Sequence, residues 1–371
     1  MKHKILIFTE KAGHLSLAKA AESFLKDLPD TKIKMVNLMD EKIAWGFYRI
    51  SYRFFPQLTK LPFEISKKNE NLMEAVRNYL VLKYRKKILD CLKKERPDII
   101  ITTYFGYIPV LDEIKAISNF RLINIVSDPV SVHPLLLSKE ADFNIGFERY
   151  FLETAKNVGL KIKALSAGWL VRKAFFEKID KEETRRKYNL EDKLTVLVCG
   201  GSEGSNAIIW LLPFLFFSRM KKDFQIIFIC GNNKTLKNMI NSTYRIAKKI
   251  NPKIPKILVI GFTNKLHEFM AISDVVVGKA GPNLMFESIS MGKPFLAITH
   301  ISGQEDGNLK LIKERKFGWV AEDPVSASKV LKEVIENPSV LKRFKHLKKF
   351  SEENYKTGLK LAEIVNKMIN N

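Results

Sequence analysis

Cysteine is scarce in this chain, and its positions exclude two classes of protein. The sequence has 3 cysteines among 371 residues, Cys91, Cys199 and Cys230, which lie far apart inside apolar stretches. They have no metal-ligand spacing and cannot all pair, which argues against a clustered zinc site and a disulfide scaffold. We expect buried free thiols in a reducing compartment.

Long apolar runs are also missing. The longest run, residues 208–217, is interrupted by Pro213 and is about half of the ~20 residues that a membrane-spanning helix needs. The N-terminal apolar run, residues 5–8, is short and is followed by no small-residue cleavage site. We therefore predict a first strand there rather than a signal peptide, and a cytoplasmic protein without membrane spans.

Acidic residues are few relative to basic ones. The chain has 63 Lys and Arg against 40 Asp and Glu, a formal net charge of +23. Such an excess favours an anionic partner, either nucleic acid or an acidic membrane surface, and composition alone does not choose between them. Apolar residues make up 46% of the chain, which favours packed domains over disorder, and the length suits two of them.

Short apolar strands alternate with helical patterns in both halves of the chain. We predict strands at residues 4–8, 32–37, 98–103, 122–126, 225–230, 257–260, 275–277 and 294–298, and another that begins at Leu194. This alternation is typical of α/β domains with parallel sheets. No internal repeat or low-complexity tract is visible. Because the alternation occurs in both halves of the chain, we predict two Rossmann-like domains.

Residues 274–308 combine two loops suited to a phosphorylated ligand. Residues 278–282 join a strand to a helix, whose first N–H groups are unpaired and attract an anion such as a diphosphate. Gly281 lets a ligand approach the main chain, and Pro282 suits the first helical turn. The second loop, residues 303–308, carries groups that can hydrogen-bond a sugar. Both loops follow strands, at the sheet edge where open α/β sheets bind ligands.

Three further loops follow predicted strands in the same way. Residues 200–206 read GGSEGSN, a second phosphate-binding turn. Residues 9–14 end in His14, and residues 127–134 contain Asp128 and His133. A lone histidine is more often structural, but an acid and an imidazole at the carboxyl end of a strand are also placed for chemistry.

Residues 44–68 mix aromatic and basic side chains. The candidate membrane contacts are Trp45, Phe47, Tyr48, Arg49, Tyr52, Arg53, Phe54 and Phe55. Rings at headgroup depth beside cations suit a segment that lies on an anionic membrane surface. The alternative is a core helix with a basic outer face. Nucleic acid would also suit aromatics among cations, but no nucleic-acid module is recognisable, and we expect no nucleic-acid partner.

The motifs resemble glycosyltransferase family 28. Its K-x-G-G-x-T-x-x-E-A and P-G-Q-E-x-x-N patterns correspond here to KAGPNLMFES and SGQEDGN, with Pro282 and Met285 replacing Gly and Thr. The first loop is similar to its G-G-G-H-x-x-A-A pattern, and residues 127–133 to its T-D-x-x-x-x-H element. The family includes the diacylglycerol sugar transferases, which this chain resembles most, and the lipid II-forming N-acetylglucosaminyltransferase, whose G-G-S-x-G-A motif resembles residues 200–205.

The resemblance implies an α/β fold of GT-B type, with two Rossmann-like domains facing a cleft. Residues 1–170 would bind the acceptor and the membrane, residues 190–345 would bind the UDP-sugar, and residues 346–371 would return to the first domain as a helix. The charged segment 171–189 is the predicted hinge.

The resemblance also implies roles for individual residues. Glu287 would hold the ribose hydroxyls, and Phe262 would flank the uracil. The full set of implied donor contacts is Gly201, Ser202, Phe262, Lys279, Ala280, Gly281, Pro282, Asn283, Glu287, Gln304, Glu305 and Asn308. Gly13 and His133 would face the acceptor. We predict His14 as the general base, with Asp128 orienting it or serving as the base instead.

The expected activity is inverting transfer of a hexose from a UDP-sugar to a lipid, most simply diacylglycerol, by an enzyme bound peripherally to the inner face of the cell membrane. No D-x-D motif occurs in the chain, so we expect no essential metal ion and no cofactor. One alternative is transfer to a polyprenyl-diphosphate sugar, as in lipid II synthesis. Another is a noncatalytic protein that binds anionic membranes or nucleic acid, which would leave residues 274–308 without a purpose.

Overall fold

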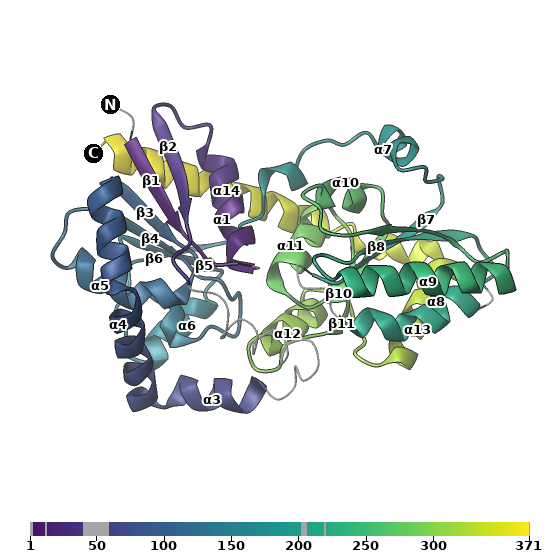
Figure 1. The fold of residues 1–371 in the computed structure, drawn as a ribbon, viewed down its shortest axis with the longest axis horizontal. Helices are drawn as coiled ribbons and strands as arrows, with labels where there is room; N and C mark the ends of the chain where they lie inside the picture. Colours follow the sequence, from purple (N-terminus) through teal and green to yellow (C-terminus); the bar gives the residue numbers. More distant parts are fainter. Residues whose placement is uncertain (1–2, 12, 40–58, 202–205, 219, 371) are drawn as a thin grey trace.

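Two parallel sheets form the centre of this protein (Figure 1). The computed structural model describes residues 3–11, 13–39, 59–201, 206–218 and 220–370. Within those residues each half of the chain builds one six-stranded sheet, and helices cover its faces. The predicted α/β class with two Rossmann-like units is confirmed.

The N-terminal sheet has the strand order β2-β1-β3-β4-β5-β6. Its elements are β1 His3–Phe8, α1 Gly13–Leu25, β2 Thr31–Val36, α3 Lys60–Lys68, α4 Glu70–Glu95, β3 Ile99–Thr102, the 3₁₀ turn η2 Phe105–Tyr107, α5 Ile108–Lys115, β4 Arg121–Ile125, η3 Pro134–Leu136, β5 Phe143–Phe147, α6 Tyr150–Asn157 and β6 Ala164–Ala167.

The C-terminal sheet has the strand order β12-β11-β10-β7-β8-β9. Its elements are η4 Lys173–Phe175, α7 Lys181–Lys187, β7 Leu194–Cys199, η5 Asn206–Leu211, α8 Leu212–Phe217, β8 Phe224–Ile229, α9 Lys234–Ile250, β9 Lys256–Ile260, α10 Leu266–Ala271, β10 Val275–Lys279, α11 Pro282–Ser290, β11 Phe295–Thr299, α12 Asp306–Glu314, β12 Gly318–Val320, α13 Pro324–Glu336, η6 Pro338–Phe344 and α14 Leu347–Asn370.

Central strands are continuous apolar runs because both of their faces are buried. In β1, residues 5–8 are fully buried, and all of β3 and β8 is buried. A strand covered on both sides by helices requires this pattern. Apolar patterning does not reveal β5, β6 and β12. Asn144 and Gly146 interrupt the apolar run of β5, whereas β6 and β12 are short and only partly covered.

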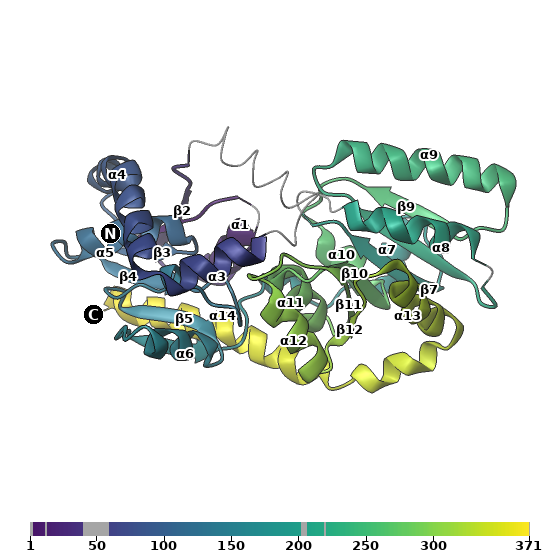
Figure 2. The same ribbon diagram turned by 90° about the horizontal axis from the view of Figure 1, so that it is seen from below.

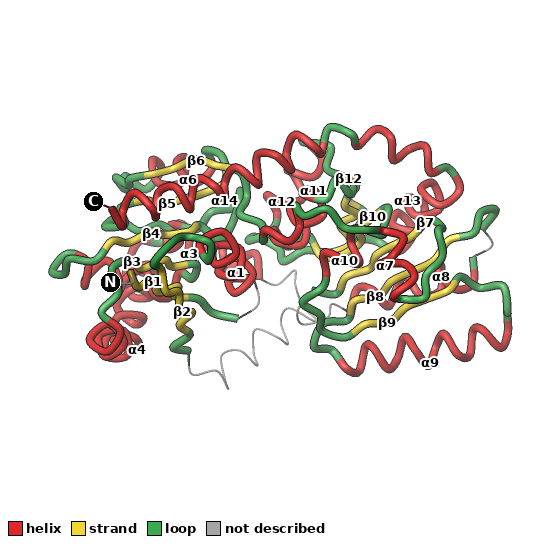
Figure 3. The backbone as a smooth tube through the Cα atoms, turned by 90° about the horizontal axis from the view of Figure 1, so that it is seen from above, coloured by secondary structure: helices red, strands yellow, loops and turns green. Residues whose placement is uncertain are grey.

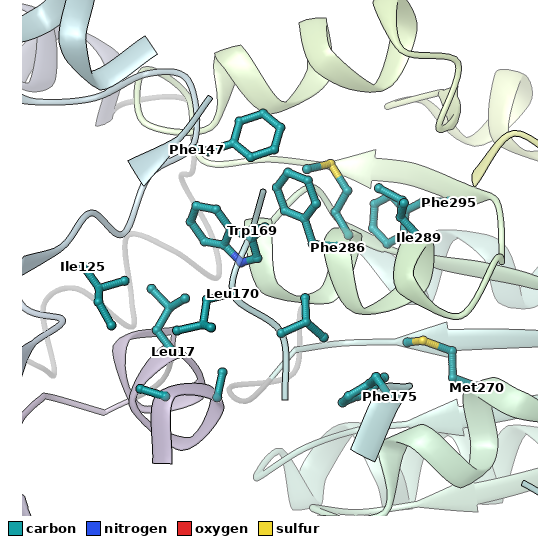
Figure 4. Packing of buried hydrophobic residues seen from close by; sticks show 14 of the residues in the cluster. Leu17, Ile125, Phe147, Trp169, Leu170, Phe175, Met270, Phe286, Ile289 and Phe295 are labelled. Carbon is teal, nitrogen blue, oxygen red and sulfur yellow. The ribbon is translucent and has the colours of Figure 1, made fainter. Parts of the chain in front are cut away.

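One hydrophobic core runs through both halves of the molecule. It contains Ile5 of β1 together with Phe295 of β11. Between the sheets, Trp169 stacks on Phe286 of α11 with ring centroids 5.2 Å apart, and Phe147 of β5 packs on Phe286 at 4.9 Å (Figure 4). The two sheets are therefore joined by packed aromatic side chains as well as by the hinge.

The last helix, α14, lies along both halves of the molecule (Figure 2). It packs against α1 and α11. Gly358 allows its close contact with α1, because a Cβ at this position would lie 2.3 Å from the Phe24 ring. The Asn354 side chain accepts a hydrogen bond from the Trp169 N–H and donates one to the Ser290 hydroxyl. A single side chain thus ties α14 to the segment just before the hinge and to α11.

The hinge, residues 171–189, is more ordered than its charged composition suggests. It contains η4 and α7, and Val171 and Phe175 are fully buried in the shared core. Figure 3 shows how this segment and α14 connect the two sheets. Charge patterning misses this because the buried apolar side chains, Val171 and Phe175, are few among the exposed charged residues of the segment.

Helices α3 and α4 form a corner on the N-terminal half. All eight candidate membrane residues between positions 45 and 55 lie outside the described part of the chain. Among the described residues, no helix is both long enough and apolar enough to cross a bilayer.

Candidate active site

The carboxyl ends of the two sheets meet at one junction. Asn283 donates from Nδ2 to the Gly13 carbonyl at 2.9 Å, and Gln304 donates to Asp128 at 3.1 Å. A third contact runs from the Gly307 N–H to the Ser131 hydroxyl at 3.0 Å. Four loops singled out in the sequence, those at residues 9–14, 127–134, 278–282 and 303–308, are therefore brought together by contacts within them or at their ends.

His14 stands in the first turn of α1 and is held by the loop after β3. Its Nδ1 lies 2.7 Å from the Thr103 carbonyl oxygen. Because a carbonyl only accepts, Nδ1 carries the proton, and Nε2 keeps a lone pair. The Thr103 hydroxyl also donates to the His14 carbonyl at 3.1 Å. Thr103 thus fixes both the backbone and the ring of His14.

Burial lowers the pKa of His14 to about 4, and the bond to the Thr103 carbonyl opposes that shift only partly. The imidazole is therefore neutral at neutral pH, which is the form a general base needs. The prediction that Asp128 orients His14 is wrong: the Thr103 carbonyl occupies Nδ1, and Asp128 is bonded to Gln304 instead.

Asp128 follows β4 and is 5% exposed. Burial and the nearby negative charge of Glu305 raise its pKa to about 7, although the bond from Gln304 and the charge of Lys279 pull it down. An acid with this pKa exchanges its proton near neutral pH. The second predicted base thus has chemical properties distinct from those of His14.

Lys279, at the end of β10, forms an ion pair with Glu305 in the loop before α12. Both side chains are largely buried. The other carboxylate oxygen of Glu305 accepts the Ile301 N–H at 2.7 Å. The predicted sugar-contact residue Glu305 is therefore held in place from both sides.

Helix α11 begins at Pro282 with Gly281 as its N-cap, and glycine supplies no capping side chain. The first N–H groups of the helix are then available to an anion. Next to this turn, Asn308 donates to the Ala280 carbonyl at 2.8 Å, while its buried side-chain oxygen has no hydrogen-bond partner among the described residues. The turn has the features of a phosphate site, as its sequence predicts.

Glu287 lies deeper in α11 and is 6% exposed. Arg172 of the hinge donates to its Oε1 from Nη2 at 2.9 Å and from Nε at 3.3 Å. Burial raises the pKa of Glu287, and the charge and hydrogen bonds of Arg172 oppose that shift. Oε2 makes no hydrogen bond among the described residues, so it can accept from a ligand hydroxyl.

Asn283 joins three parts of the structure. Besides its bond to Gly13, its Oδ1 accepts from the Trp169 indole N–H at 3.1 Å. Both ends of the amide are thus engaged in joining α11, the first loop and Trp169, which lies just before the hinge. Its predicted role in donor binding would therefore act through its backbone N–H, which lies in the first turn of α11.

His133 lies against α3 and is 9% exposed. Its Nδ1 accepts the Leu135 N–H at 3.2 Å, and its Nε2 is 3.2 Å from the Ser66 hydroxyl. The Phe63 ring packs edge-on against it at 5.5 Å. Both nitrogens are used within the protein, so His133 anchors α3, and an acceptor contact of the kind predicted would need one of these bonds to break.

The remaining predicted donor residues lie at the ends of β7 and β9. Gly201 adopts a φ of 75°, which favours glycine, and Ser202 lies outside the described residues. Phe262 follows β9 and is 58% exposed, so its ring is available to a ligand. Among the described residues no group of three or more His, Cys, Asp and Glu side chains could hold a metal ion.

Several residues of the site carry no sequence signal that would have identified them. Thr103 and Arg172 are bonded to residues distant in the chain. The sequence immediately around each of them contains no recognisable motif. His300 and Asp306 flank the predicted sugar loop, and only the structure shows that they contact each other.

The fold defines the class of the protein. MurG of Acinetobacter baumannii superimposes with a TM-score of 0.62 at 13% identity, covering 98% of this chain and 99% of that one. The structure of TcCGT1 in complex with UDP superimposes with a TM-score of 0.64 at 12% identity, covering 99% and 100%. The chain therefore has the GT-B glycosyltransferase fold.

Family models match both halves. Residues 195–364 match the glycosyltransferase family 28 C-terminal domain, and residues 16–167 match the monogalactosyldiacylglycerol (MGDG) synthase model. The C-terminal half therefore matches the glycosyltransferase family 28 domain, as the motifs at residues 278–308 predict.

Two relatives of similar sequence have names that refer to diacylglycerol. Monogalactosyldiacylglycerol synthase 1 of Arabidopsis thaliana is 26% identical over 349 residues, covering 88% of this chain and 63% of that protein. The processive diacylglycerol beta-glucosyltransferase of Staphylococcus epidermidis is 25% identical over 359 residues, covering 91% and 86%. The chain thus spans less than two thirds of the plant enzyme and most of the bacterial one.

Proposed function

We propose that this protein is an inverting glycosyltransferase that moves a hexose from a UDP-sugar to the hydroxyl of diacylglycerol. The observation that carries the proposal is the junction itself. A neutral imidazole with a free Nε2 lone pair and an acid with a pKa of about 7 lie across from the uncapped start of α11. The names of the relatives supply the substrate class.

The donor would lie along the C-terminal half. Its diphosphate would accept from the first N–H groups of α11 near Gly281, and its ribose hydroxyls would donate to Glu287 Oε2. Phe262 would pack on the uracil, and Gln304 with Glu305 would contact the sugar. Each of these groups lies at the carboxyl end of a strand or in the helix that follows it.

The reaction would be a direct displacement. His14 Nε2 takes the proton of the acceptor hydroxyl while that oxygen attacks the anomeric carbon, and the bond from this carbon to the diphosphate oxygen breaks. Negative charge then grows on the diphosphate, where helix N–H groups and Lys279 stabilise it. Asp128 is the competing candidate for the base. We propose that no metal ion is required, so turnover should persist in excess EDTA.

The lipid would be reached from the α3–α4 corner. Leu61 and Ile65 of α3 are 69% and 48% exposed, and Leu72 of α4 is 39% exposed. Basic residues accompany them, including Lys67 and Lys68 in the last turn of α3. Apolar side chains beside cations favour an anionic bilayer surface. We propose peripheral binding to the inner face of the cell membrane, with no nucleic-acid partner.

The decisive experiment combines purified protein, vesicles of diacylglycerol with phosphatidylglycerol, and a panel of UDP-sugars, with products identified by mass spectrometry. A glycosyl-diacylglycerol product supports the proposal. A product formed only on a polyprenyl-diphosphate sugar would move the protein to the lipid II type of activity. Absence of any product, together with no heat of UDP binding in calorimetry, would overturn the enzyme assignment.

A further inference from the structure

A cluster of four charged groups lies beside residues 301–305, the sugar-contact loop, and none of the four is among the individual donor contacts assigned above. It consists of Asp306 at the start of α12, His300 after β11, Glu322 after β12 and Lys60 of α3. The first three belong to the C-terminal half, and Lys60 comes from the N-terminal half. The cluster therefore connects the donor side to α3.

Asp306 is the centre of this cluster. Its Oδ1 accepts the Gly303 N–H at 2.8 Å and lies 3.0 Å from His300 Nε2. Its Oδ2 lies 3.0 Å from the Lys60 ammonium. One carboxylate thus holds the loop backbone, a neighbouring side chain and a helix of the other half.

His300 bridges two carboxylates, because its Nδ1 is bonded to Glu322 and its Nε2 to Asp306. A ring with an acceptor at both nitrogens is stabilised as the doubly protonated cation. Burial alone would lower the pKa of His300, but Glu322 and Asp306 outweigh it, so the pKa lies above its usual value. The charges facing the ring come from Glu322 and Asp306, with Lys60 on the far side of Asp306.

Helix α3 also packs directly on the loop. The Thr59 hydroxyl donates to the Ser302 carbonyl at 2.8 Å. Gly303 has a φ of 88°, and a Cβ at this position would lie 3.1 Å from the Lys60 Cα and the Phe63 Cβ. The loop that precedes Gln304 and Glu305 is therefore confined between β11, α12 and α3.

We propose that Asp306 is a positioning residue that fixes the sugar-contact loop against α3, so that the N-terminal half helps to select and hold the donor sugar. The inference rests on the proposed function in one respect, namely that Gln304 and Glu305 contact the sugar. Asp306 itself touches the loop, His300 and Lys60 rather than the reacting atoms.

We call the contacts of Asp306 with the Gly303 N–H, His300 and Lys60 the clamp. Two variants test its two sides. Asp306→Asn keeps an acceptor for the Gly303 N–H but removes the charge that binds His300 and Lys60. Lys60→Met removes only the contact from α3. Glu314→Gln, an exposed acid on α12, and Lys156→Met, an exposed lysine on α6 of the N-terminal half, are the controls.

The first readout compares UDP with UDP-sugar by calorimetry. We expect Asp306→Asn to weaken the binding of the preferred UDP-sugar about tenfold and that of UDP less than twofold, because only the sugar meets the loop. Lys60→Met should show a smaller loss in the same direction and add nothing to Asp306→Asn. Equal losses for UDP and UDP-sugar, or losses as large in the two controls, would overturn the proposal.

The second readout is the pH profile of the donor KM. In the unmodified protein the KM should rise as pH increases through the raised pKa of His300, because loss of its proton weakens the hold on Asp306. In Asp306→Asn the rise should be smaller, with only the titration of Asp128, which accepts from Gln304, still contributing, and kcat should change little. A rise of equal size in the variant would overturn the role of this cluster.

The third readout is hydrogen–deuterium exchange of the backbone amides at residues 301–305, which needs no activity. Faster exchange in Asp306→Asn and Lys60→Met than in the controls supports the clamp, and unchanged exchange overturns it. If the unmodified protein binds no UDP-sugar, the proposed function fails, while this exchange still decides whether the clamp exists.

Discussion

At the scale of single residues, the distinctive feature is how two neutral histidines differ. His14 donates from Nδ1 to a carbonyl and leaves Nε2 free, whereas His133 accepts at Nδ1 and uses Nε2 on Ser66. Burial lowers the pKa of both rings to about 4. The same residue type is therefore placed for the proposed proton transfer in one loop and for anchoring in another.

Replacing His14 tests the base directly. We expect His14→Ala to lower kcat by about 10²- to 10⁴-fold, because that is the usual contribution of a positioned general base. Calorimetric binding of UDP should stay within twofold. His346→Ala, a change at an exposed histidine, is the control. Near-normal turnover by a folded His14→Ala protein would shift the role to Asp128.

Arg172 provides a second test at this scale. Arg172→Met leaves Glu287 buried without a cation, so its pKa should rise further and the carboxyl should gain a proton near neutral pH. We expect the Kd for UDP to rise at least about tenfold and the free energy of unfolding to fall by roughly 3–5 kcal/mol. The exposed Arg149→Met change is the control. If Arg172→Met is too unstable, Arg172→Met with Glu287→Gln should recover stability but not affinity.

At the scale of elements, α3 has two faces with different tasks. One face meets His133 and the loop before α12, through Phe63, Ser66 and Lys60. The other carries Leu61 and Ile65 in the open. Without a buried residue of its own, α3 depends on these contacts for its position.

We expect the burial of His133, which anchors α3, to make the stability of the protein depend on pH. The folded protein keeps His133 neutral down to a pKa of about 4, whereas the unfolded chain takes a proton at about 6.5. The stabilisation is therefore complete above pH 6.5 and is lost as pH falls toward 4, by roughly 2 kcal/mol at pH 5. In urea titrations, His133→Gln should lose less stability between pH 7 and pH 5 than the unmodified protein. Parallel losses would contradict this origin.

We predict that the outer face of α3, which carries Leu61 and Ile65, contacts the membrane. Leu61→Ser with Ile65→Ser should reduce binding to phosphatidylglycerol vesicles at least about tenfold in flotation, since two apolar side chains leave the bilayer surface. Ile246→Ser with Ile250→Ser changes two equally exposed residues on α9 and should have no effect. Equal losses in both pairs would mean that the contact is not local to α3.

At the scale of the whole molecule, close contacts between backbones set how the two halves meet. A Cβ at Gly307 would lie 2.6 Å from the Cβ and Cγ1 of Val130, and one at Gly168 would lie 2.8 Å from the Asn354 side chain. A side chain at either position would therefore force the neighbouring side chain or the backbone to move.

Gly307→Val should therefore separate the two halves at the junction. We expect transfer to fall more than tenfold, UDP affinity to change less than twofold, and the radius of gyration from small-angle scattering to increase. Adding Val130→Gly, which removes both contacting carbons, should restore part of the activity. An unchanged radius and full activity would show that the junction tolerates the side chain.

The sequence by itself determined the two α/β units, most of the strands, the glycine turn that begins α11 at Gly281 and the loops that carry His14, Asp128 and Gln304. These features are local, because apolar periodicity and a strand–glycine–helix order follow from neighbouring residues. Only the tertiary structure decided which of these groups touch. The Thr103 carbonyl sets the tautomer of His14, Arg172 compensates the buried charge of Glu287, and Lys60 reaches Asp306 from the other half. Such pairings depend on how two sheets pack across one hinge, and no local pattern specifies that geometry.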